Sequence, residues 1–387
     1  MSLQTKKNKG VLIIVPTFSP NVGGVETHMD DLVRLLNEKR FNIYVHTYSP
    51  ITTPGVSWKP KEQWDNVHIW RYRWFGKTLL HRLETKPLLH FLYLTPYLLV
   101  RTLVFMLFNR AKIDLIHAQG FNAAFIGGIL KKLFKKPLIV STHALYDIKP
   151  NSRNAERIRG IISGADAVLT LARTSHEELV SFGIDAQKIR EYRYWIDLET
   201  FKPFKDKAGL KERLGITGDF IVLFVGRLTE IKGVRELAAA ASMLPQMNFV
   251  FIGTGPLEGF LMEKSAQEKN IQFLGRKTGQ DLVSAYNAAH ILCIPSQYRE
   301  GFGRVVMEAL ACGIPVVASN KGALTLALDE SVAILVDPTA ENLKNALSKL
   351  QADKRLYSQL QQNSRLYAER FFSEKNAEAI LDTYRIF

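Results

Sequence analysis

Cysteine is scarce in this sequence. Cys293 and Cys312 are its two cysteines among 387 residues, nineteen positions apart, with no second group of cysteine and histidine near them. This pattern excludes a disulfide framework and does not match the spacing of zinc ligands. We therefore expect a reducing, cytoplasmic compartment. The basic segment 1–10 agrees with that expectation, because it lacks the small-residue cleavage site of a secretory signal.

Acidic residues are fewer than basic ones: 37 Asp and Glu stand against 51 Lys and Arg, a formal net charge of +14. Such an excess indicates an anionic partner, which is nucleic acid, an anionic membrane or a phosphorylated ligand. Residues 1–200 hold 28 basic and 17 acidic residues (+11), whereas residues 201–387 hold 23 and 20 (+3). No nucleic-acid-binding motif accompanies this charge, so we expect no nucleic-acid partner.

Glycine and proline are spread evenly, and 47% of the residues are hydrophobic, which excludes a disordered or collagen-like chain. The length predicts two domains. Short apolar runs alternate with longer helical stretches, as in parallel sheets buried on both faces, so two doubly wound α/β domains are expected. The expected strands are 11–16, 43–47, 68–72, 114–117, 138–142, 167–170, 188–190, 220–225, 249–252, 271–274, 291–294, 315–318 and 333–336.

One long apolar run, residues 87–108, interrupts this alternation. Its length approaches the ~20 residues that span a bilayer, but His90, Pro96 and Arg101 argue against a spanning helix. Two interpretations stay open, a helix packed on the first domain and a helix lying in a membrane interface. The second is favoured by flanking basic residues, namely Arg71, Arg73, Lys77, Arg82, Lys86, Arg110 and Lys112, and by a further basic helix end at 131–136.

Two glycine-containing loops follow strands and precede helices. Gly23 and Gly24 stand before an amphipathic helix, where backbone N–H groups and the helix dipole favour an anion. In the second half, Arg227 follows a strand directly and Lys232 lies at a helix start. Ligands of open α/β sheets bind at the carboxyl ends of strands, and this pair of cations suits a diphosphate.

The strongest signal is the segment 295–317, in which a strand end at Pro295 is followed by a Glu300–Gly303 loop and then by a nearly continuous apolar helix. Glu300 and Glu308 are eight positions apart, which in a continuous helix would span about 12 Å. That exceeds the ~5–9.5 Å between paired glycosidase carboxylates and disfavours two-carboxylate hydrolysis. It suits a long ligand held by sugar hydroxyls at Glu300 and ribose hydroxyls at Glu308, with the N–H groups of Gly301–Arg304 on phosphate between them.

These motifs together resemble retaining glycosyltransferases of family 4, also called glycosyl transferases group 1, over essentially the whole chain. The matching positions are Gly23–Glu26, Ser141–His143, Gly226–Arg227 with Lys232, Phe251–Pro256, Phe273–Gly275, and Glu300 to Glu308. The resemblance implies the GT-B fold: two Rossmann-like domains facing a central cleft, with the C-terminal helix crossing back. The expected domains are 1–198 with 371–387, on the acceptor side, and 199–370, which binds the nucleotide sugar.

The resemblance also implies a role for each matching residue. Gly24 would meet the donor phosphate or sugar, and His143 the transferred sugar, as a positioning group more than a general base; a purely structural histidine stays open. Arg227 and Lys232 would neutralise the departing diphosphate. Glu300 would be catalytic together with His143, Arg227 and Lys232, and with Gly301, Phe302 and Gly303 it would hold the sugar and phosphates. Val305 and Glu308 would bind the ribose, and the backbone from Leu274 to Arg276 the base. Arg304 replaces a residue that is often apolar in relatives, so it either contacts phosphate or caps the motif.

No Asp-x-Asp pair occurs, so the metal signature of the other major glycosyltransferase architecture is absent and we expect no metal or other cofactor. The family's course is front-face substitution with retained configuration. We expect transfer of a hexose, glucose from UDP-glucose above others, to a saccharide or lipid-linked saccharide in envelope or exopolysaccharide synthesis, at the inner face of the cytoplasmic membrane. Two alternatives remain: a GT-B sugar-nucleotide epimerase, and a dehydrogenase. The Gly253–Gly259 segment resembles a dinucleotide fingerprint but follows the second strand of its domain.

Overall fold

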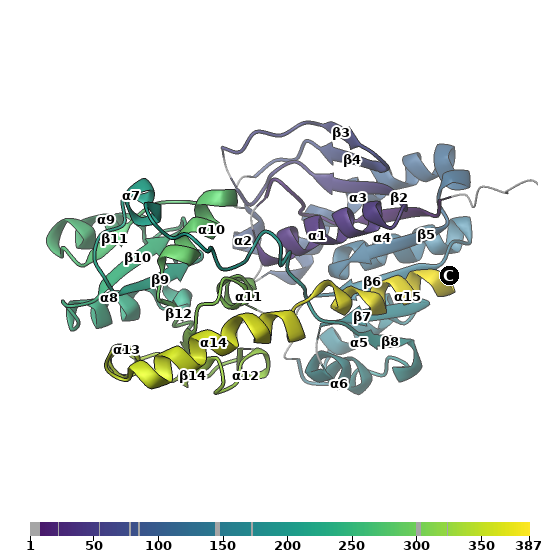
Figure 1. Ribbon diagram of the computed structural model, residues 1–387. Coiled ribbons are helices and arrows are strands. Elements are labelled where there is room, and N and C mark those ends of the chain that lie inside the picture. The colour runs from purple at the N-terminus through teal and green to yellow at the C-terminus, as the bar shows by residue number, and fades with distance from the viewer. Residues whose placement is uncertain are drawn as a thin grey trace, which may run out of the picture. The chain divides into compact units, whose positions relative to one another are not determined.

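The computed structural model describes residues 8–21, 23–53, 55–76, 79–83, 86–143, 148–171, 173–298, 303–322 and 324–387. The chain divides into two compact units, Met1–Tyr194 with Asn376–Phe387, and Trp195–Lys375 (Figure 1). The boundary lies four residues before position 198, where we had expected it. The returning C-terminal segment begins at 376 and not at 371, because the long helix α14 (Lys354–Phe371) belongs to the second unit.

The first unit contains an eight-stranded sheet in the order β3-β4-β2-β1-β5-β6-β7-β8, parallel except for β3. The strands are β1 (Gly10–Ile14), β2 (Asn42–Tyr48), β3 (Lys61–Trp64), β4 (Val67–Tyr72), β5 (Leu115–Gln119), β6 (Leu138–Thr142), β7 (Ala167–Thr170) and β8 (Ile189–Glu191). All correspond to expected strands apart from β3. This short edge strand, which pairs antiparallel with β4, was missed because it is polar and only half-buried.

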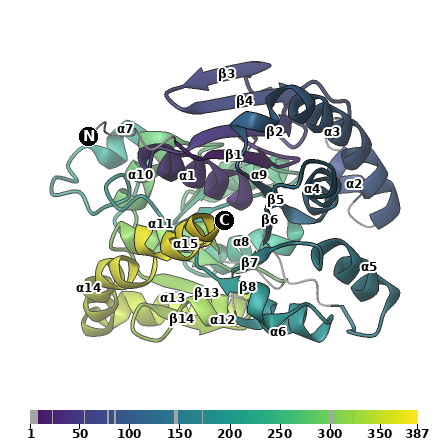
Figure 2. The ribbon, with the colours of Figure 1, turned by 90° about the vertical axis from the view of Figure 1, so that its right-hand side faces the viewer.

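Helices cover both faces of this sheet. They are α1 (Gly24–Glu38), α2 (Leu79–Leu83), α3 (Pro87–Asn109), α4 (Gly120–Phe134), α5 (Arg153–Ile162), α6 (Arg173–Ser181) and α15 (Glu378–Ile386), with short 3-10 turns at Arg110–Lys112, Ala186–Lys188 and Glu374–Ala377. Figure 2 shows α1 and α15 on one face and α3 and α4 on the other. Opposite faces are what right-handed crossovers require when the strand order reverses beside β1.

Helix α3 is the long apolar run of the sequence. Its inner face, including Tyr93, Leu98 and Met106, is buried in the core of the unit. Pro96 lies inside the helix, and nearby the Tyr48 hydroxyl is inserted into the ladder: it donates to the carbonyl of Leu94 (2.7 Å) and accepts from the N–H of Leu98 (3.1 Å). A side chain inserted in this way satisfies helix groups that no longer pair with each other. The expectation of a helix packed on the first domain is thus confirmed for one face.

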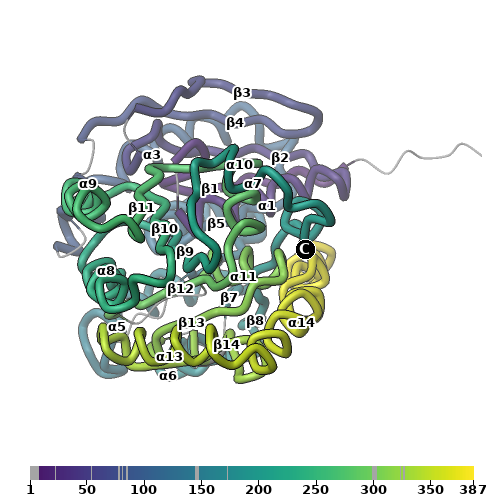
Figure 3. Tube along the Cα trace, turned by 60° about the vertical axis from the view of Figure 1, so that its left-hand side comes forward, coloured from purple at the N-terminus to yellow at the C-terminus, as the bar shows by residue number. Residues whose placement is uncertain are grey.

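The second unit contains a six-stranded, fully parallel sheet in the order β11-β10-β9-β12-β13-β14 (Figure 3). Its strands are β9 (Ile221–Val225), β10 (Asn248–Ile252), β11 (Ile271–Phe273), β12 (Ile291–Ile294), β13 (Val316–Ser319) and β14 (Ala333–Val336). Its helices are α7 (Leu210–Leu214), α8 (Val234–Ser242), α9 (Glu258–Gln267), α10 (Gly279–Ala288), α11 (Arg304–Ala311), α12 (Leu324–Ala327), α13 (Ala340–Ala352) and α14, with a 3-10 turn at Glu230–Lys232. The order reverses between β9 and β12, which defines the position where such sheets bind ligands.

Candidate active site

The loops after β9 and β12 meet at the strand-order reversal of the second unit. Lys232, at the end of the 3-10 turn after β9, donates a hydrogen bond to the hydroxyl of Tyr298 after β12 (2.9 Å). Its ammonium group also lies 4.9 Å from the centre of the Tyr298 ring. A cation is therefore fixed between the two strands where a doubly wound sheet opens toward a ligand.

Glycine lets these loops approach each other closely. Gly233 has a φ of +70°, and a Cβ there would stand 1.9 Å from the carbonyl oxygen of Pro295. A Cβ on Gly253, after β10, would stand 1.8 Å from the carbonyl oxygen of Gly226. Any side chain at these positions would push the loops apart, so glycine is required for the close approach of the loops at the carboxyl edge of the sheet.

Helix α11 presents its N-terminus at the same edge, because it follows β12 in the chain. Its N-cap is Gly303, with a φ of 63°, and this residue has no side chain that could cap the first N–H groups. The first N–H groups of a helix need acceptors, and the helix dipole favours a negative one. The preceding residues Glu300, Gly301 and Phe302 lie outside the described residues.

Glu308 is buried on α11 and hydrogen-bonded through both carboxylate oxygens. Its two carboxylate oxygens accept hydrogen bonds from the Tyr286 hydroxyl (2.7 Å) and from Nε of Arg304 (3.1 Å). The Arg304 and Glu308 side chains are 9% and 7% exposed. Arg304 was expected to contact phosphate or to cap the motif. The structure shows a third arrangement, an ion pair with Glu308 one helical turn along α11. Val305, between them, is half-buried.

The other donor-side residues lie on the same edge of the sheet. Arg227 follows β9 and is exposed, and Leu274 to Arg276 follow β11. The carbonyl of Gly275 accepts a hydrogen bond from the N–H of Gly253 (3.0 Å), which ties the loop after β11 to the loop after β10. In the second unit, the described residues expected to bind the donor thus come from the loops after β9 and β11 and from helix α11, while Gly24 belongs to the first unit.

In the first unit, Gly24 begins α1 immediately after the loop from β1. Helix α1 has no side-chain cap, and a Cβ built on Gly24 would meet no atom within 4 Å. Gly23 is extended, with a φ of 177°. Neither backbone strain nor packing therefore demands glycine at position 24. Its glycine leaves space at position 24 itself, whereas the Glu26 carboxylate lies beside Gly23, where a Cβ would stand 2.2 Å from Oε2.

His143 follows β6 and bonds through both ring nitrogens. Its Nε2 lies 2.7 Å from Oε1 of Gln119, and its Nδ1 lies 3.1 Å from the Tyr194 hydroxyl. Because an amide oxygen only accepts, Nε2 carries the proton and donates, and Nδ1 accepts from Tyr194. Burial lowers the pKa of His143 to about 4, so the ring is neutral at pH 7. The ring is neutral, and the lone pair on Nδ1 already accepts a hydrogen bond from the Tyr194 hydroxyl. Such a ring is suited to orienting a ligand, not to removing a proton.

A buried polar cluster supports His143. His117 lies 2.7 Å through Nε2 from the Ser141 hydroxyl and hydrogen-bonds through Nδ1 to the hydroxyl of Tyr384 on α15. Burial lowers the pKa of His117 to about 3 and raises that of Tyr384. His28 stacks on the ring of Tyr194 at 4.0 Å between centroids.

Sequence reasoning missed several residues that contact the expected ones, namely Gln119, Tyr194, Tyr286 and Tyr298. One of them carried a readable signal. Gln119 is a polar residue at the carboxyl end of a buried strand, a position from which side chains reach ligands in α/β folds. The tyrosines lie in segments whose spatial neighbours are not apparent from the sequence.

Comparison with known proteins now identifies the family. Its sequence models, described as Glycosyltransferase Family 4 and Glycosyl transferases group 1, match residues 22–200 and 206–367. The D-inositol 3-phosphate glycosyltransferase of Corynebacterium jeikeium (strain K411) is 30% identical over 302 residues, which are 70% of this chain and 72% of that relative. The chain belongs to glycosyltransferase family 4. Its two units are the paired Rossmann-like domains of a GT-B glycosyltransferase, as expected.

Solved structures agree with this fold. Sucrose-phosphate synthase from Thermosynechococcus elongatus superposes with a TM-score of 0.78 at 23% identity, covering 98% of both chains. The Anabaena protein HepE, solved in complex with UDP-glucose, superposes with a TM-score of 0.75 at 18% identity and covers 98% of this chain and 100% of its own. These likenesses show that the glycosyltransferase has the GT-B fold.

Proposed function

We propose that this glycosyltransferase moves glucose from UDP-glucose to a saccharide or lipid-linked saccharide acceptor, with retention of configuration and without a metal ion. The product would serve envelope or exopolysaccharide synthesis. The observation that carries the proposal is Lys232, hydrogen-bonded to Tyr298 at the strand-order reversal of the second unit, on the sheet edge where α11 begins after its N-cap Gly303.

The donor side of the proposal rests on charge. A departing diphosphate develops negative charge, and preorganised cations and N–H groups lower the free energy of that state. Lys232, Arg227 and the N-terminus of α11 supply such groups on one sheet edge. HepE is solved in complex with UDP-glucose, which favours a nucleotide-sugar donor for this chain.

The reaction we propose is front-face substitution. The bond between the anomeric carbon and the diphosphate oxygen breaks, the acceptor hydroxyl attacks from the same face, and the departing phosphate takes the acceptor proton. His143, neutral with its proton on Nε2, would orient the sugar. Glu300 would hold sugar hydroxyls and Glu308 the ribose, whose hydroxyls would join or replace the Tyr286 and Arg304 contacts of its carboxylate.

We also propose that the enzyme is cytoplasmic and attaches peripherally to an anionic membrane through α3. By length and composition Pro87–Lys112 qualifies as a span, with 33% of its most apolar window buried. The outer face of α3 exposes large apolar side chains, namely Leu88, Leu89, Leu92, Val100, Val104, Leu107 and Phe108, the last 83% exposed. Arg110 and Lys112 follow directly, and the neighbouring α4 ends in the basic segment 131–136. An apolar face beside cations fits anionic headgroups.

The donor is tested by thermal unfolding of the full chain with UDP, GDP and ADP and their glucose or mannose derivatives, because a ligand that binds the folded state raises the melting temperature. We expect the largest shift with UDP-glucose, unchanged by EDTA. No shift with any nucleotide would refute the proposal, and a shift that EDTA abolishes would refute its metal-free part. Conversion of UDP-glucose to another UDP-sugar without an acceptor would identify an epimerase instead.

Two variants test the placement of the carboxylates. Glu300→Ala should lower turnover more than UDP affinity, whereas Glu308→Ala should weaken UDP binding; the reverse order would contradict these placements.

Liposome flotation tests the membrane attachment through α3. The wild type should float with anionic vesicles, and Leu107→Ser with Phe108→Ser should not. Equal recovery with neutral and anionic lipid would remove the role of the basic residues.

A further inference from the structure

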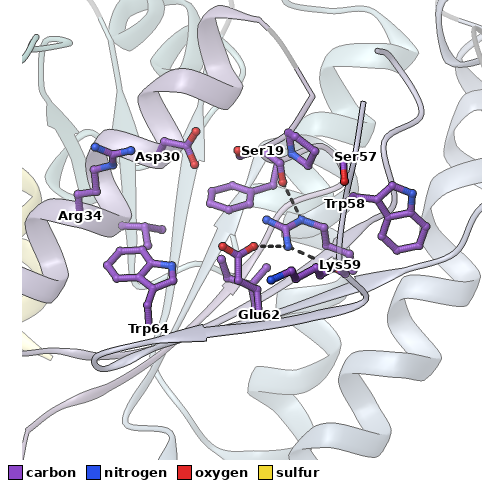
Figure 4. A pocket seen from close by; sticks show the side chains of 13 residues that line it. Ser19, Asp30, Arg34, Ser57, Trp58, Lys59, Glu62 and Trp64 are labelled. Carbon is purple, nitrogen blue, oxygen red and sulfur yellow. Dashed lines mark hydrogen bonds and ion pairs between the residues drawn. The ribbon is translucent and has the colours of Figure 1, made fainter. Parts of the chain in front are cut away.

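A cavity of about 570 Å³ opens in the first unit. Its lining includes Arg71, which was expected among the basic residues that would face a membrane but is buried and paired with Glu62 instead. The cavity lies between the β1–α1 loop, helix α1 and the segment that includes the β3–β4 hairpin (Figure 4). Its volume falls within the ~300–1,000 Å³ of typical small-molecule sites. The lining residues used below are Ser19, Asp30, Arg34, Trp58, Lys59, Glu62, Trp64 and Arg71.

Arg71 fixes the walls of this cavity. Its buried guanidinium donates to the carbonyl of Ser19 (2.7 Å), to Oε2 of Glu62 (2.7 Å) and to the carbonyl of Lys59 (3.4 Å). One side chain, 4% exposed, thereby joins the β1–α1 loop to both halves of the hairpin segment. A buried charge is tolerated when it is paired in this way, and the cavity has a defined shape because its walls are tied together.

Two indole rings stand at opposite ends of the cavity, Trp64 on one side of Glu62 and Trp58 on the other (Figure 4). Both are half-buried. Trp70 and Trp74, by contrast, pack against the core of the unit. Rings kept at a cavity wall offer flat apolar platforms to whatever enters.

Polar groups of both signs lie between the indoles. Asp30 and Arg34 project from α1, and Lys59 lies beside Glu62 (Figure 4). Burial raises the pKa of Asp30 to about 6, opposed by Arg34 and by a hydrogen bond from Ser19, so this carboxylate is poorly hydrated. A ligand that donates hydroxyl hydrogen bonds to carboxylates and accepts them from Arg and Lys would satisfy these groups.

Sugars have this combination of properties, because a pyranose ring has an apolar C–H face for an aromatic platform and hydroxyls that both donate and accept. A phosphate group matches less well than a sugar, because it offers few hydroxyl donors to the carboxylates of Asp30 and Glu62. A purely apolar ligand would leave the carboxylates without donors.

We propose that this cavity is a saccharide-binding subsite that holds a part of the acceptor glycan away from the reacting sugar. It shares the β1–α1 loop with Gly24, while Asp30 and Arg34 lie six and ten residues along α1, roughly 9 and 15 Å of helix rise. That interval is longer than one pyranose ring, so the cavity takes a different sugar residue from the one at Gly24. This inference rests on the proposed function in that the acceptor is a saccharide.

The test uses the full chain, fluorescently labelled, on an array of immobilised neutral and uronic-acid-containing oligosaccharides, with and without saturating UDP. We expect the wild type to bind a subset of the glycans, and Trp64→Ala and Trp58→Ala each to weaken that binding about tenfold. Phe75→Ala is the matched control, because Phe75 is an exposed aromatic residue of the same unit outside the cavity. It should bind like the wild type.

The rise in melting temperature with UDP shows whether a variant still folds and binds the donor, independently of glycan binding in the cavity. Every variant should keep that shift. Lys59→Ala alters an exposed side chain and leaves the carbonyl oxygen that Arg71 uses, so it should not disturb the fold. It should reduce binding to uronic-acid glycans. A wild type that shifts with UDP but binds no glycan, or tryptophan variants that bind like the wild type, would overturn the subsite. Loss of the UDP shift in the wild type would instead refute the proposed function, while the array still decides the cavity.

Discussion

Replacing Glu308 by alanine should destabilise the second unit strongly. The carboxylate is 7% exposed and bonded through both oxygens, and its removal leaves the guanidinium of Arg304, itself 9% exposed, without this partner. Breaking a buried ion pair by removing one member costs about 3–5 kcal/mol. For a unit of this size, that corresponds to a melting temperature lower by roughly 6–20 °C.

The chain contains a matched control for this substitution. Arg173 and Glu177 form the same i,i+4 pair, Nε to Oε1 at 3.0 Å, but with side chains that are 83% and 64% exposed. Exposed pairs contribute about 0.2–1 kcal/mol, so Glu177→Ala should change stability little. Glu308→Gln, which keeps an acceptor for Tyr286, should fall between the two.

The assay must resolve the units, because a two-domain protein does not unfold in one two-state step. Hydrogen exchange followed by mass spectrometry measures the opening free energy of peptides from α10 and α11 separately from those of the first unit. Equal effects of Glu308→Ala and Glu177→Ala, or a loss below about 1 kcal/mol in α11, would refute the reasoning that burial makes the first pair important.

Three further outcomes are expected. The pKa values of His117 and His143 are about 3 and 4 in the folded unit and about 6.5 when unfolded, so the unfolded state binds more protons between these values. The stability of the folded state should therefore fall as the pH drops from about 6.5 to 4. Melting temperatures that stay constant from about pH 7 to 4 would contradict this. Lys232→Ala should weaken UDP binding about tenfold and reduce its salt dependence in calorimetry, and unchanged affinity would remove Lys232 from the diphosphate site. Burial raises the pKa of the Cys293 thiol and that of Cys312 to about 12, so iodoacetamide should label neither until urea is added, which intact-mass measurement checks.

The sequence was sufficient to predict the parallel strands, because a strand buried on both faces must be apolar throughout, and runs such as Val11–Ile14 show this directly. Strand β3 is the exception. Its residues Lys61–Trp64 carry charge, lie at the sheet edge and pair with β4 alone, so no apolar run announces them. The Glu62–Arg71 ion pair and the cavity beside it depend on that missed hairpin.

The site was predictable in position more than in contacts. Lys232 was singled out because parallel sheets gather their strand ends at one edge, and His143 because of the family resemblance. Their partners depend on how distant segments meet: Tyr298 is 66 residues from Lys232, and Tyr194 is 51 from His143. The protonation state of His143 also follows from those partners, so no spacing in the sequence could reveal it.

The place of α15 has a consequence for biosynthesis. Residues 376–387 belong to the first unit, where Tyr384 is fully buried against His117 and its carbonyl accepts a hydrogen bond from Lys9. They emerge from the ribosome after the whole of the second unit. The first unit therefore stays incomplete during translation of the second, even though N-terminal domains generally fold first. A fragment that stops at residue 194 would expose the apolar face beneath α15, so expression of this unit alone calls for 376–387 to be fused back through a linker.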